Sequence, residues 1–315
     1  MNLKIIYTFC FCLLFCFPFC LNLLAQEKGH TNSDLEKILN AGQKAKPELV
    51  TAAFETTRII NAHSIENTAK GVLDLKISHR FNRLDNGFSD WFGLDGATMR
   101  IGFDYGMTDW LQIGVGRSSY NKEYDGYLKA KILRQHKNGG SPISLSYVGG
   151  LSVHTLKPNN PAGTTYFFTN RLYFFNQLLI CKKINRLLTV QLMPEHVHFN
   201  LVPTAAEPND ILALGIGGKI RISRRVALNL EYHYQLPDFK LNGSKNSVSI
   251  GADIETGGHV FQLHFTNSAG MTERTFIAQT ADTWGDGGIR FGFNISRVFT
   301  IVKPKGFENT RNKIY

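Results

Sequence analysis

The chain repeats one pattern, in which apolar and polar side chains alternate along segments of about ten residues. In residues 97–105 (Ala-Thr-Met-Arg-Ile-Gly-Phe-Asp-Tyr), every odd position is apolar and every even position is polar or glycine. Successive side chains of a strand point to opposite faces of a sheet, so each segment has one apolar face and one polar face. The pattern predicts twelve strands, near residues 71–81, 97–106, 111–116, 128–132, 143–152, 164–181, 187–200, 212–222, 226–235, 248–255, 261–265 and 289–296.

The links between these segments differ in length. Those after the second, sixth, eighth and tenth segments are tight, and two more, at 118–124 and 135–141, are intermediate. The longer links lie at 82–96, 155–163, 201–209, 237–246 and 269–287. Outer-membrane barrels have short periplasmic turns and long external loops, whereas a soluble β-sandwich has no reason to alternate its links. The sequence therefore predicts an all-β fold, an antiparallel transmembrane β-barrel of about twelve strands in the outer membrane of a Gram-negative bacterium.

The two ends of the chain differ from this pattern. Residues 1–25 have the features of an export signal, with Lys4 before an apolar run and the small residue Ala25 before a cleavage site. An uncleaved helical anchor and a lipoprotein modified at Cys20 are the alternatives. We expect residues 26–53 to form a periplasmic linker with a short helix, which begins at the capping box of residues 33–36. Residues 54–301 form the barrel, and 302–315 form a basic tail.

Composition narrows the class of protein further. The net charge of +10 is scattered over strands and turns and is not gathered into one basic stripe, so nucleic acid is not an expected partner. Four of the five cysteines lie in the signal, which leaves only Cys181 in the mature chain. We therefore expect no internal disulfide and no metal site built on cysteines, and we predict no cofactor.

The polar faces of the strands are expected to face the lumen. With Arg171 included, this set holds nine positive side chains and five negative ones. A pore lined in this way would prefer anions mildly. The predicted pore-lining residues are Lys76, Arg80, Arg100, Lys129, Lys131, Lys219, Arg221, Glu231, His233 and Arg290. The leading hypothesis is a pore or solute-binding barrel, with outer-membrane lipid and a small anionic solute as its partners.

Residues 51–68 have no clear period. They fit an extra strand, an extended segment inside the barrel or a loop, and they are our candidate for a plug. A barrel of eight strands is filled by its own side chains and one of sixteen holds a water channel, so twelve strands leave open and closed interiors both feasible.

Two histidines, His196 and His198, lie two positions apart and so share one face of a strand. Neutral imidazoles placed in this way can bind zinc or copper, and His233, His154 or Glu231 would be the third ligand. Two ligands do not define a site, and we predict no metal. The chain also lacks a nucleophile elbow, so we predict no catalytic residues. The glycines of 215–218 indicate close packing or a bend in the wall.

Two other functions fit the pattern. A closed structural barrel would dock a partner, in the periplasm or through the loops 82–96 and 269–287, which carry Trp91, Phe92 and Trp284. A barrel enzyme that acts on lipid is the third alternative.

Several short blocks of sequence, taken together, resemble a known family. They are residues 77–81, 114–119, 124–127, 192–194, 257–263, 284–287 and 291–297. The chain resembles, over about 54–301, a domain-of-unknown-function family described as a membrane-bound β-barrel of Gram-negative bacteria. The resemblance implies the same fold and compartment, and it brings no activity and no site residues.

Overall fold

The computed structural model describes residues 48–156 and 166–303. The expected export signal, the short helix near residue 33 and all but the first residues of the basic tail lie outside this range. Within the described part, none of the helices is long and apolar enough to cross a membrane.

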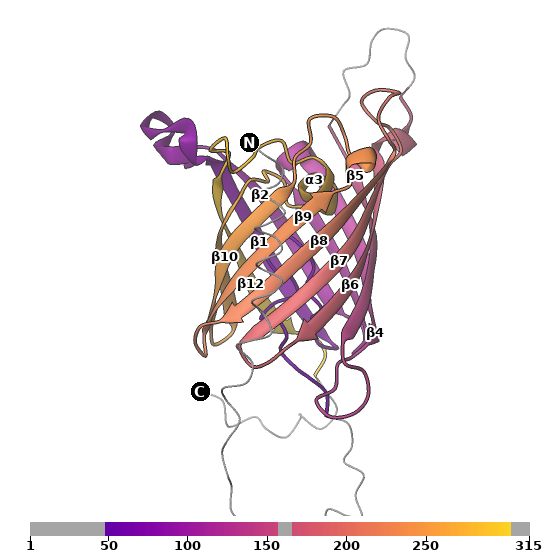
Figure 1. Cartoon of the computed structure of the whole chain (residues 1–315), viewed down its shortest axis with the longest axis vertical. Coiled ribbons are helices and arrows are strands. Elements are labelled where there is room, and N and C mark those ends of the chain that lie inside the picture. Colours follow the sequence, from indigo (N-terminus) through magenta and orange to yellow (C-terminus); the bar gives the residue numbers. More distant parts are fainter. Residues whose placement is uncertain (1–47, 157–165, 304–315) are drawn as a thin grey trace, which may run out of the picture. The chain divides into compact units, whose positions relative to one another are not determined.

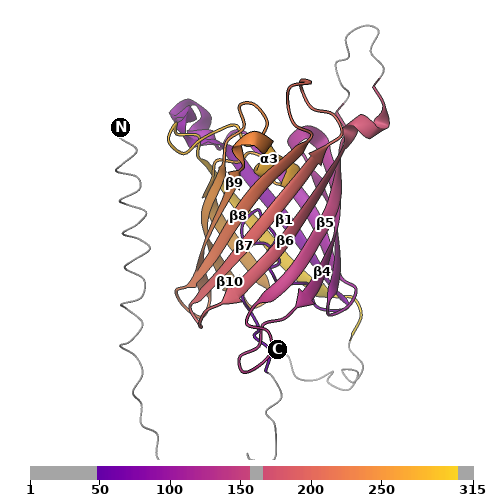
Figure 2. The same cartoon turned by 45° about the vertical axis from the view of Figure 1, so that its right-hand side comes forward.

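Twelve strands form one closed antiparallel barrel, as the alternating pattern predicts (Figures 1 and 2). The strands are β1 (Val72–Arg83), β2 (Ala97–Gly106), β3 (Leu111–Ser118), β4 (Glu123–Leu133), β5 (Ser144–His154), β6 (Leu172–Lys183), β7 (Leu188–Phe199), β8 (Asp210–Arg221), β9 (Val226–Gln235), β10 (Ser247–Thr256), β11 (His259–Thr266) and β12 (Arg290–Thr300). Each strand pairs with its sequence neighbours, and β1 closes the ring by pairing with β12, from Val72 opposite Thr300 to Arg80 opposite Gly292. Closure pairs the backbone polar groups along the whole wall, as a hydrocarbon environment requires.

The distribution of side chains is the reverse of that in a soluble protein. In β2, Arg100 and Asp104 point inward and are buried, whereas Ile101 and Phe103 point outward and are exposed. The same alternation continues around the barrel, so that apolar side chains cover its outer surface. A surface of this kind is stable only in contact with lipid.

The connections define two ends of the barrel. We call the end with turns 107–110, 134–143, 184–187, 222–225 and 257–258 the short-turn end, which faces the periplasm in outer-membrane barrels. The opposite, long-loop end is at the top of Figure 1. Its loops carry η1 (Leu84–Asn86), η2 (Phe88–Gly93), η3 (Tyr120–Lys122), η4 (Phe168–Arg171), η5 (Pro237–Phe239) and α3 (Glu273–Ala278).

Two strands begin at positions that differ from the prediction. Strand β4 begins at Glu123, five residues before the clear alternation, and β6 begins only at Leu172. Arg171 therefore lies in η4 and not in the barrel wall, so its predicted inward position was wrong.

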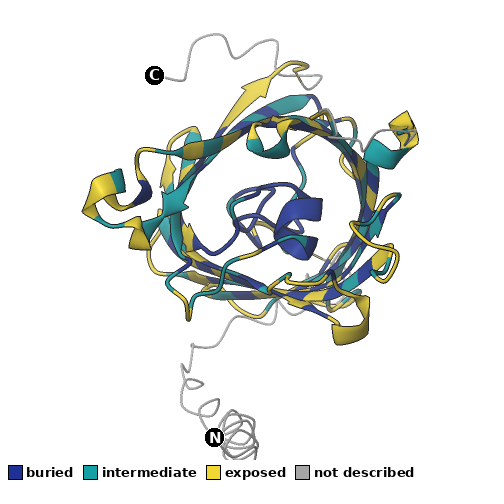
Figure 3. Cartoon of the chain, turned by 90° about the horizontal axis from the view of Figure 1, so that it is seen from above, coloured by how far each residue is buried: buried dark blue, intermediate teal, exposed yellow. Residues whose placement is uncertain are grey.

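Two parts of the chain enter the barrel and are buried inside it (Figure 3). The first, residues 53–68, is here called the luminal segment. The second, residues 267–280 with helix α3, is here called the luminal loop. The long link at 269–287 was expected to lie outside the barrel, and that expectation was wrong for most of its length. Trp284 lies at the rim, where its indole N–H donates to the Val248 carbonyl oxygen at 3.1 Å.

Candidate functional site: the occupied lumen

The luminal segment is a hairpin that enters from the short-turn end. The Ile59 N–H donates to the Ala62 carbonyl oxygen at 2.8 Å, and the Ser64 N–H donates to the Thr57 carbonyl oxygen at 3.0 Å. The chain therefore rises along the lumen, reverses at residues 59–62 and descends to the start of β1. Of the three alternatives for residues 51–68, the structure shows a segment inside the barrel.

The tip of the hairpin is held by one carboxylate of the wall. Glu231 accepts hydrogen bonds from the backbone N–H groups of Ile60, Asn61 and Ala62 at 2.9–3.1 Å. It also accepts one from the side-chain amide of Asn61 at 2.7 Å. Hydrogen bonds to an ionised acceptor are stronger than neutral ones, so Glu231 is the main anchor of the tip.

One side of the luminal segment meets a polar wall. Arg80 donates to the Asn61 side-chain oxygen at 2.8 Å, and the Asn294 amide donates to the Ile60 carbonyl oxygen at 3.0 Å. Lower in the lumen, Lys76 donates to the Thr57 hydroxyl. The polar groups on this side of the interface could form their hydrogen bonds with water instead of with the hairpin.

The base of the luminal segment is held by wall cations. Lys219 and Arg221 donate to the Glu55 carboxylate at 3.1 and 2.5 Å, and Lys129 donates to the Glu66 carbonyl oxygen. Each of these cations has its partner on the luminal segment and not on the wall.

The other side of the luminal segment is apolar. Phe54 and Ile59 belong to one buried cluster with wall side chains of β5–β8. Most of these wall side chains come from inward positions that are apolar, such as Leu179, Met193 and Val197. The hairpin therefore has a mainly apolar face toward β5–β8 and a polar face toward β1, β9, β11 and β12. On the apolar side, polar side chains of β4, β7 and β8 bond to its two arms.

The luminal loop enters the barrel from the long-loop end. Helix α3 begins at a capping box formed by Thr272 and Thr275. Arg274 donates to Glu123 of the wall at 2.7 Å and lies over the ring of Tyr173. Its neighbour Glu273 accepts from Arg58 of the luminal segment at 2.5 Å. The two insertions thus meet inside the barrel.

All ten predicted pore-lining residues point to the lumen or to its mouths, but most of them contact protein and not an open channel. Lys76 pairs with Asp74 and Asp104, Arg100 pairs with Asp125, and Arg290 pairs with Asp282. His233 is fully buried and lies 2.8 Å from Glu195. Lys131 is half-buried toward the short-turn end. Arg80, Lys129, Lys219, Arg221 and Glu231 contact the luminal segment as described above.

Three buried wall carboxylates, Glu123, Asp125 and Glu195, were not predicted from the sequence. The first two precede the clear alternation of β4, and the parity of β7 had not been assigned. Arg171 no longer counts as an inward charge, because it lies in η4. The three additional carboxylates then cancel the remaining excess of positive charge on the inward faces. The resting wall is therefore close to neutral.

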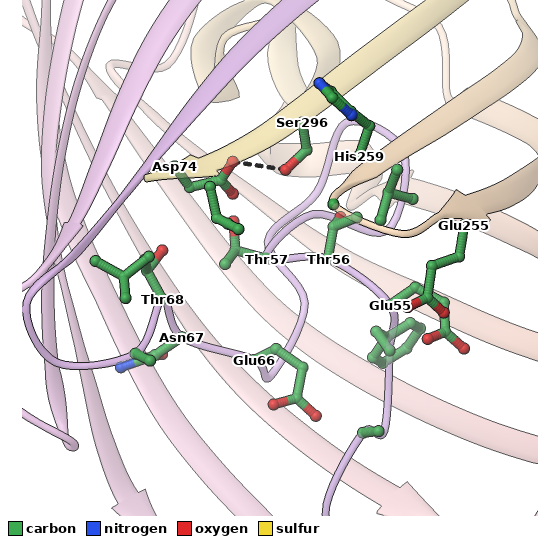
Figure 4. Close-up of a pocket in the computed structure, with 17 residues that line it drawn as sticks. Glu55, Thr56, Thr57, Glu66, Asn67, Thr68, Asp74, Glu255, His259 and Ser296 are labelled. Carbon is green, nitrogen blue, oxygen red and sulfur yellow. Dashed lines mark hydrogen bonds between the residues drawn. The ribbon is translucent and has the colours of Figure 1, made fainter. Parts of the chain in front are cut away.

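A cavity of about 520 Å³ opens at the short-turn end, between the luminal segment and β1, β10, β11 and β12 (Figure 4). Glu55, Glu66, Asp74 and Glu255 line it, and the Ser296 hydroxyl donates to Asp74 at 2.6 Å. Further inside, a separate space of about 10 Å³ lies between the hairpin tip and Lys76, Arg80 and Arg100, which is room for about one water molecule.

An ion-pair cluster ties two loops together at the long-loop rim. Arg83 donates to Asp85 at 2.5 and 2.8 Å, and it also donates to Asp282 at 3.0 Å. The hydrogen bonds from the Arg83 guanidinium lower the pKa of the Asp85 carboxyl below its usual value.

The fold and the filled lumen define a membrane-embedded β-barrel that is occupied by parts of its own chain. More particularly, residues 54–299 match the family model described as a membrane bound beta barrel domain (DUF5777), and the chain belongs to this family. A closed, even-stranded antiparallel barrel with an apolar outer surface is the architecture of Gram-negative outer-membrane proteins. The protein is therefore an outer-membrane β-barrel, as the sequence predicts.

Solved structures of similar fold include porins and a channel. The chain is 6% identical to the NanC porin, with 73% of this chain and 100% of that chain covered and a TM-score of 0.45. The chain is 9% identical to the KdgM porin in complex with disordered oligogalacturonate, with 72% of this chain and 99% of that chain covered and a TM-score of 0.44. It is 12% identical to an outer membrane channel from Pseudomonas putida F1, with 75% of this chain and 98% of that chain covered and a TM-score of 0.47. No curated protein matches the chain.

Proposed function

We propose that the barrel is a gated pore for a small polar solute, and that it conducts only when the luminal segment leaves its place. The observation that carries this proposal is the polar interface between the hairpin and the wall. Glu231, Arg80 and Lys219 bond to the hairpin with groups that water can replace when the hairpin moves.

A barrel with only a structural role would have little use for this interface. Buried charges are costly and contribute little net stability compared with apolar side chains of similar size. A wall that must hold a plug at one time and water at another needs such side chains. The cavity of about 520 Å³ at the short-turn end would be the lower part of the route.

The charges released on opening favour anions. Arg80, Lys129, Lys219 and Arg221 all have partners on the luminal segment, whereas Glu231 is the main wall carboxylate that loses such partners. Charges that pair within the wall, such as those of Arg100 and Asp125, stay paired. Displacement of the hairpin therefore frees four cations and one carboxylate along its path, so the vacated part of the lumen is locally positive although the wall as a whole is close to neutral. This local excess gives a mild preference for anionic solutes.

Planar-bilayer recording tests the proposal. The wild-type barrel should conduct rarely, and a variant that lacks residues 53–68 should conduct steadily with a reversal potential that favours anions. In that background, Arg80→Gln together with Lys219→Gln should reduce the anion preference. The outward-facing Arg117→Gln is the matched control and should leave it unchanged.

A second variant covers the case in which the deletion does not fold. Glu231→Gln combined with Glu55→Gln removes the charged anchors and keeps the chain length, and it should raise the fraction of time spent open. Correctly folded variants without conductance would favour the closed structural barrel, and cation selectivity would refute the anionic solute.

A further inference from the structure

The outer face of the barrel carries a cluster of metal-ligating side chains that is separate from the lumen. His196 and His198 project outward from the last part of β7, and Asp210 is the first residue of β8. His198 and Asp210 are direct partners across the strand pair. The cluster therefore lies at the long-loop end of the wall, on the side away from the pore.

The three side chains converge on one point. His196 Nε2 lies 2.8 Å from Asp210 Oδ1, and His198 Nδ1 lies 2.7 Å from the same oxygen. Both imidazoles are about one-third exposed, and Asp210 is about half exposed. An ion can therefore reach the three ligand atoms from outside without passing through the barrel.

The structure brings to the two histidines a residue that was not among those considered from the sequence. Of the three residues considered as a third ligand, His233 and Glu231 are buried inside the lumen on the opposite face of the wall, and His154 ends β5. The third side chain of the cluster is Asp210, which is close because β7 and β8 are antiparallel neighbours.

A second layer of side chains supports His196 at its other nitrogen. The Asn176 side-chain amide lies 3.3 Å from His196 Nδ1, and the Tyr147 hydroxyl contacts Asn176 in turn. The two ends of an amide are assigned from their hydrogen bonds and can be exchanged by a flip. As the structure stands, the amide nitrogen of Asn176 faces Nδ1, and Nε2 carries the ring proton toward Asp210. A metal ion at Nε2 would move this proton to Nδ1, and the Asn176 oxygen would then accept from Nδ1–H after a flip of the amide, which is how outer partners orient the histidines of metal sites.

We propose that His196, His198 and Asp210 bind one divalent transition-metal ion of the Zn²⁺ or Cu²⁺ type, with a fourth position open to solvent. Two imidazoles and one carboxylate suit these ions, and three protein ligands with one open position are a common set for zinc. Tetrahedral bonds of about 2.1 Å place ligand atoms about 3.4 Å apart. The ligand atoms lie within 4.8 Å of one another, so partly exposed side chains need only small rotations.

The site does not depend on the pore, because its ligands face away from the lumen. Its test uses the full mature chain without a polyhistidine tag, folded in detergent. Calorimetric titration with Zn²⁺ should give one equivalent, and Co²⁺ should give the visible absorption of a low-coordinate site. His198→Ala and Asp210→Asn should each weaken the affinity at least about tenfold, and His136→Ala, which lies in a turn at the opposite end, should not.

The contact between Asn176 and His196 gives a second test, because its loss should change the Zn²⁺ affinity only if His196 binds the ion. Asn176→Ala leaves all three ligands in place and should weaken Zn²⁺ binding about tenfold, as expected for loss of an outer partner. If the Asp210 variant fails to fold, His198→Gln replaces it as a variant that lacks one ligand. Absence of stoichiometric binding, or equal binding by wild type and His198→Ala, would show that the cluster is only an ion pair and would overturn the proposal.

Discussion

The guanidinium of Arg58 lies 2.5 Å from the carboxylate of Glu273, and this ion pair joins the two insertions that fill the lumen. Arg58 belongs to the luminal segment, which enters at the short-turn end, and Glu273 belongs to α3, which enters at the long-loop end. His63 Nε2 lies 3.1 Å from the same carboxylate. The two ends of the barrel are therefore coupled through one carboxylate in its interior, so movement of either insertion changes the surroundings of the other.

Loss of both members of this pair should destabilise the barrel by less than the sum of the two single losses. Glu273→Ala leaves the Arg58 charge buried without its carboxylate, and breaking a buried pair in this way costs about 3–5 kcal/mol. Arg58→Met together with Glu273→Ala should cost less than the sum of the single changes. Urea unfolding in detergent, followed by tryptophan fluorescence, measures these values.

The exposed pair of Glu48 and Lys137 provides the matched control. Both side chains are more than half exposed, so Glu48→Ala should change the free energy of unfolding by less than about 1 kcal/mol. Additive effects of the two luminal substitutions would contradict the coupling between the insertions.

The sequence predicts the wall far better than it predicts the contents of the lumen, and the reason is physical. A strand repeats every two residues, so its parity alone shows that Arg100 points inward and Ile101 outward. The hairpin at residues 53–68 has no such period. Its fold depends on contacts between residues that are far apart in the sequence. Asn61 and Glu231, for example, are separated by 170 residues.

One signal for the second insertion was present in the sequence. Phe276, Ile277 and Ala278 are consecutive apolar residues within a link that was expected to face solvent, and all three are fully buried in α3. A long external loop rarely contains such a run without a place to bury it. Asp210, by contrast, could not be identified as a partner of His196 and His198 before the register of β7 and β8 was known.

Glu231→Gln should release the tip of the hairpin. The substitution keeps the shape of the side chain but replaces a charged acceptor of several hydrogen bonds with a weaker one. Hydrogen bonds to charged groups contribute about 1.5–3 kcal/mol each, so the amides of residues 60–62 should exchange at least about tenfold faster. Hydrogen exchange read by mass spectrometry measures this. Glu255→Gln, an exposed carboxylate at the end of β10, should leave the exchange unchanged, and equal rates in both variants would show that Glu231 does not anchor the tip.

The rim contact between Arg83 and Asp85 should resist mild acid. The pKa of Asp85 is lowered in the folded protein, so its contribution is fully present above the ordinary aspartate pKa of about 3.9. The contribution is lost as the pH falls through the lower pKa of the folded state. Hydrogen exchange of loop 84–96 should therefore show no loosening attributable to Asp85 between neutral pH and about pH 5. Asp85→Asn should loosen the loop already at neutral pH, and the same exchange in wild type and variant would exclude a role for the pair.

The hairpin can also be displaced sterically, because a glycine of the wall makes room for it. Gly217 lies in the glycine cluster of β8, and a Cβ atom at this position would overlap with Cδ1 of Ile59 in the luminal segment. Close packing therefore accounts for a glycine at this point of the wall. Gly217→Val should push the hairpin away from β8, at a cost of about 1–3 kcal/mol for overpacking, and should raise the open probability in bilayer recordings.

A compensating change separates this effect from general damage. Ile59→Ala removes the side chain that the valine would strike, so Gly217→Val together with Ile59→Ala should return the open probability toward that of the wild type. The matched control is Gly243→Val, which lies in a loop at the long-loop end where added atoms meet nothing nearby but the backbone has a positive φ. That variant should strain its own loop and leave the conductance unchanged. If Gly217→Val folds and the barrel stays as closed as the wild type, the hairpin does not gate the pore.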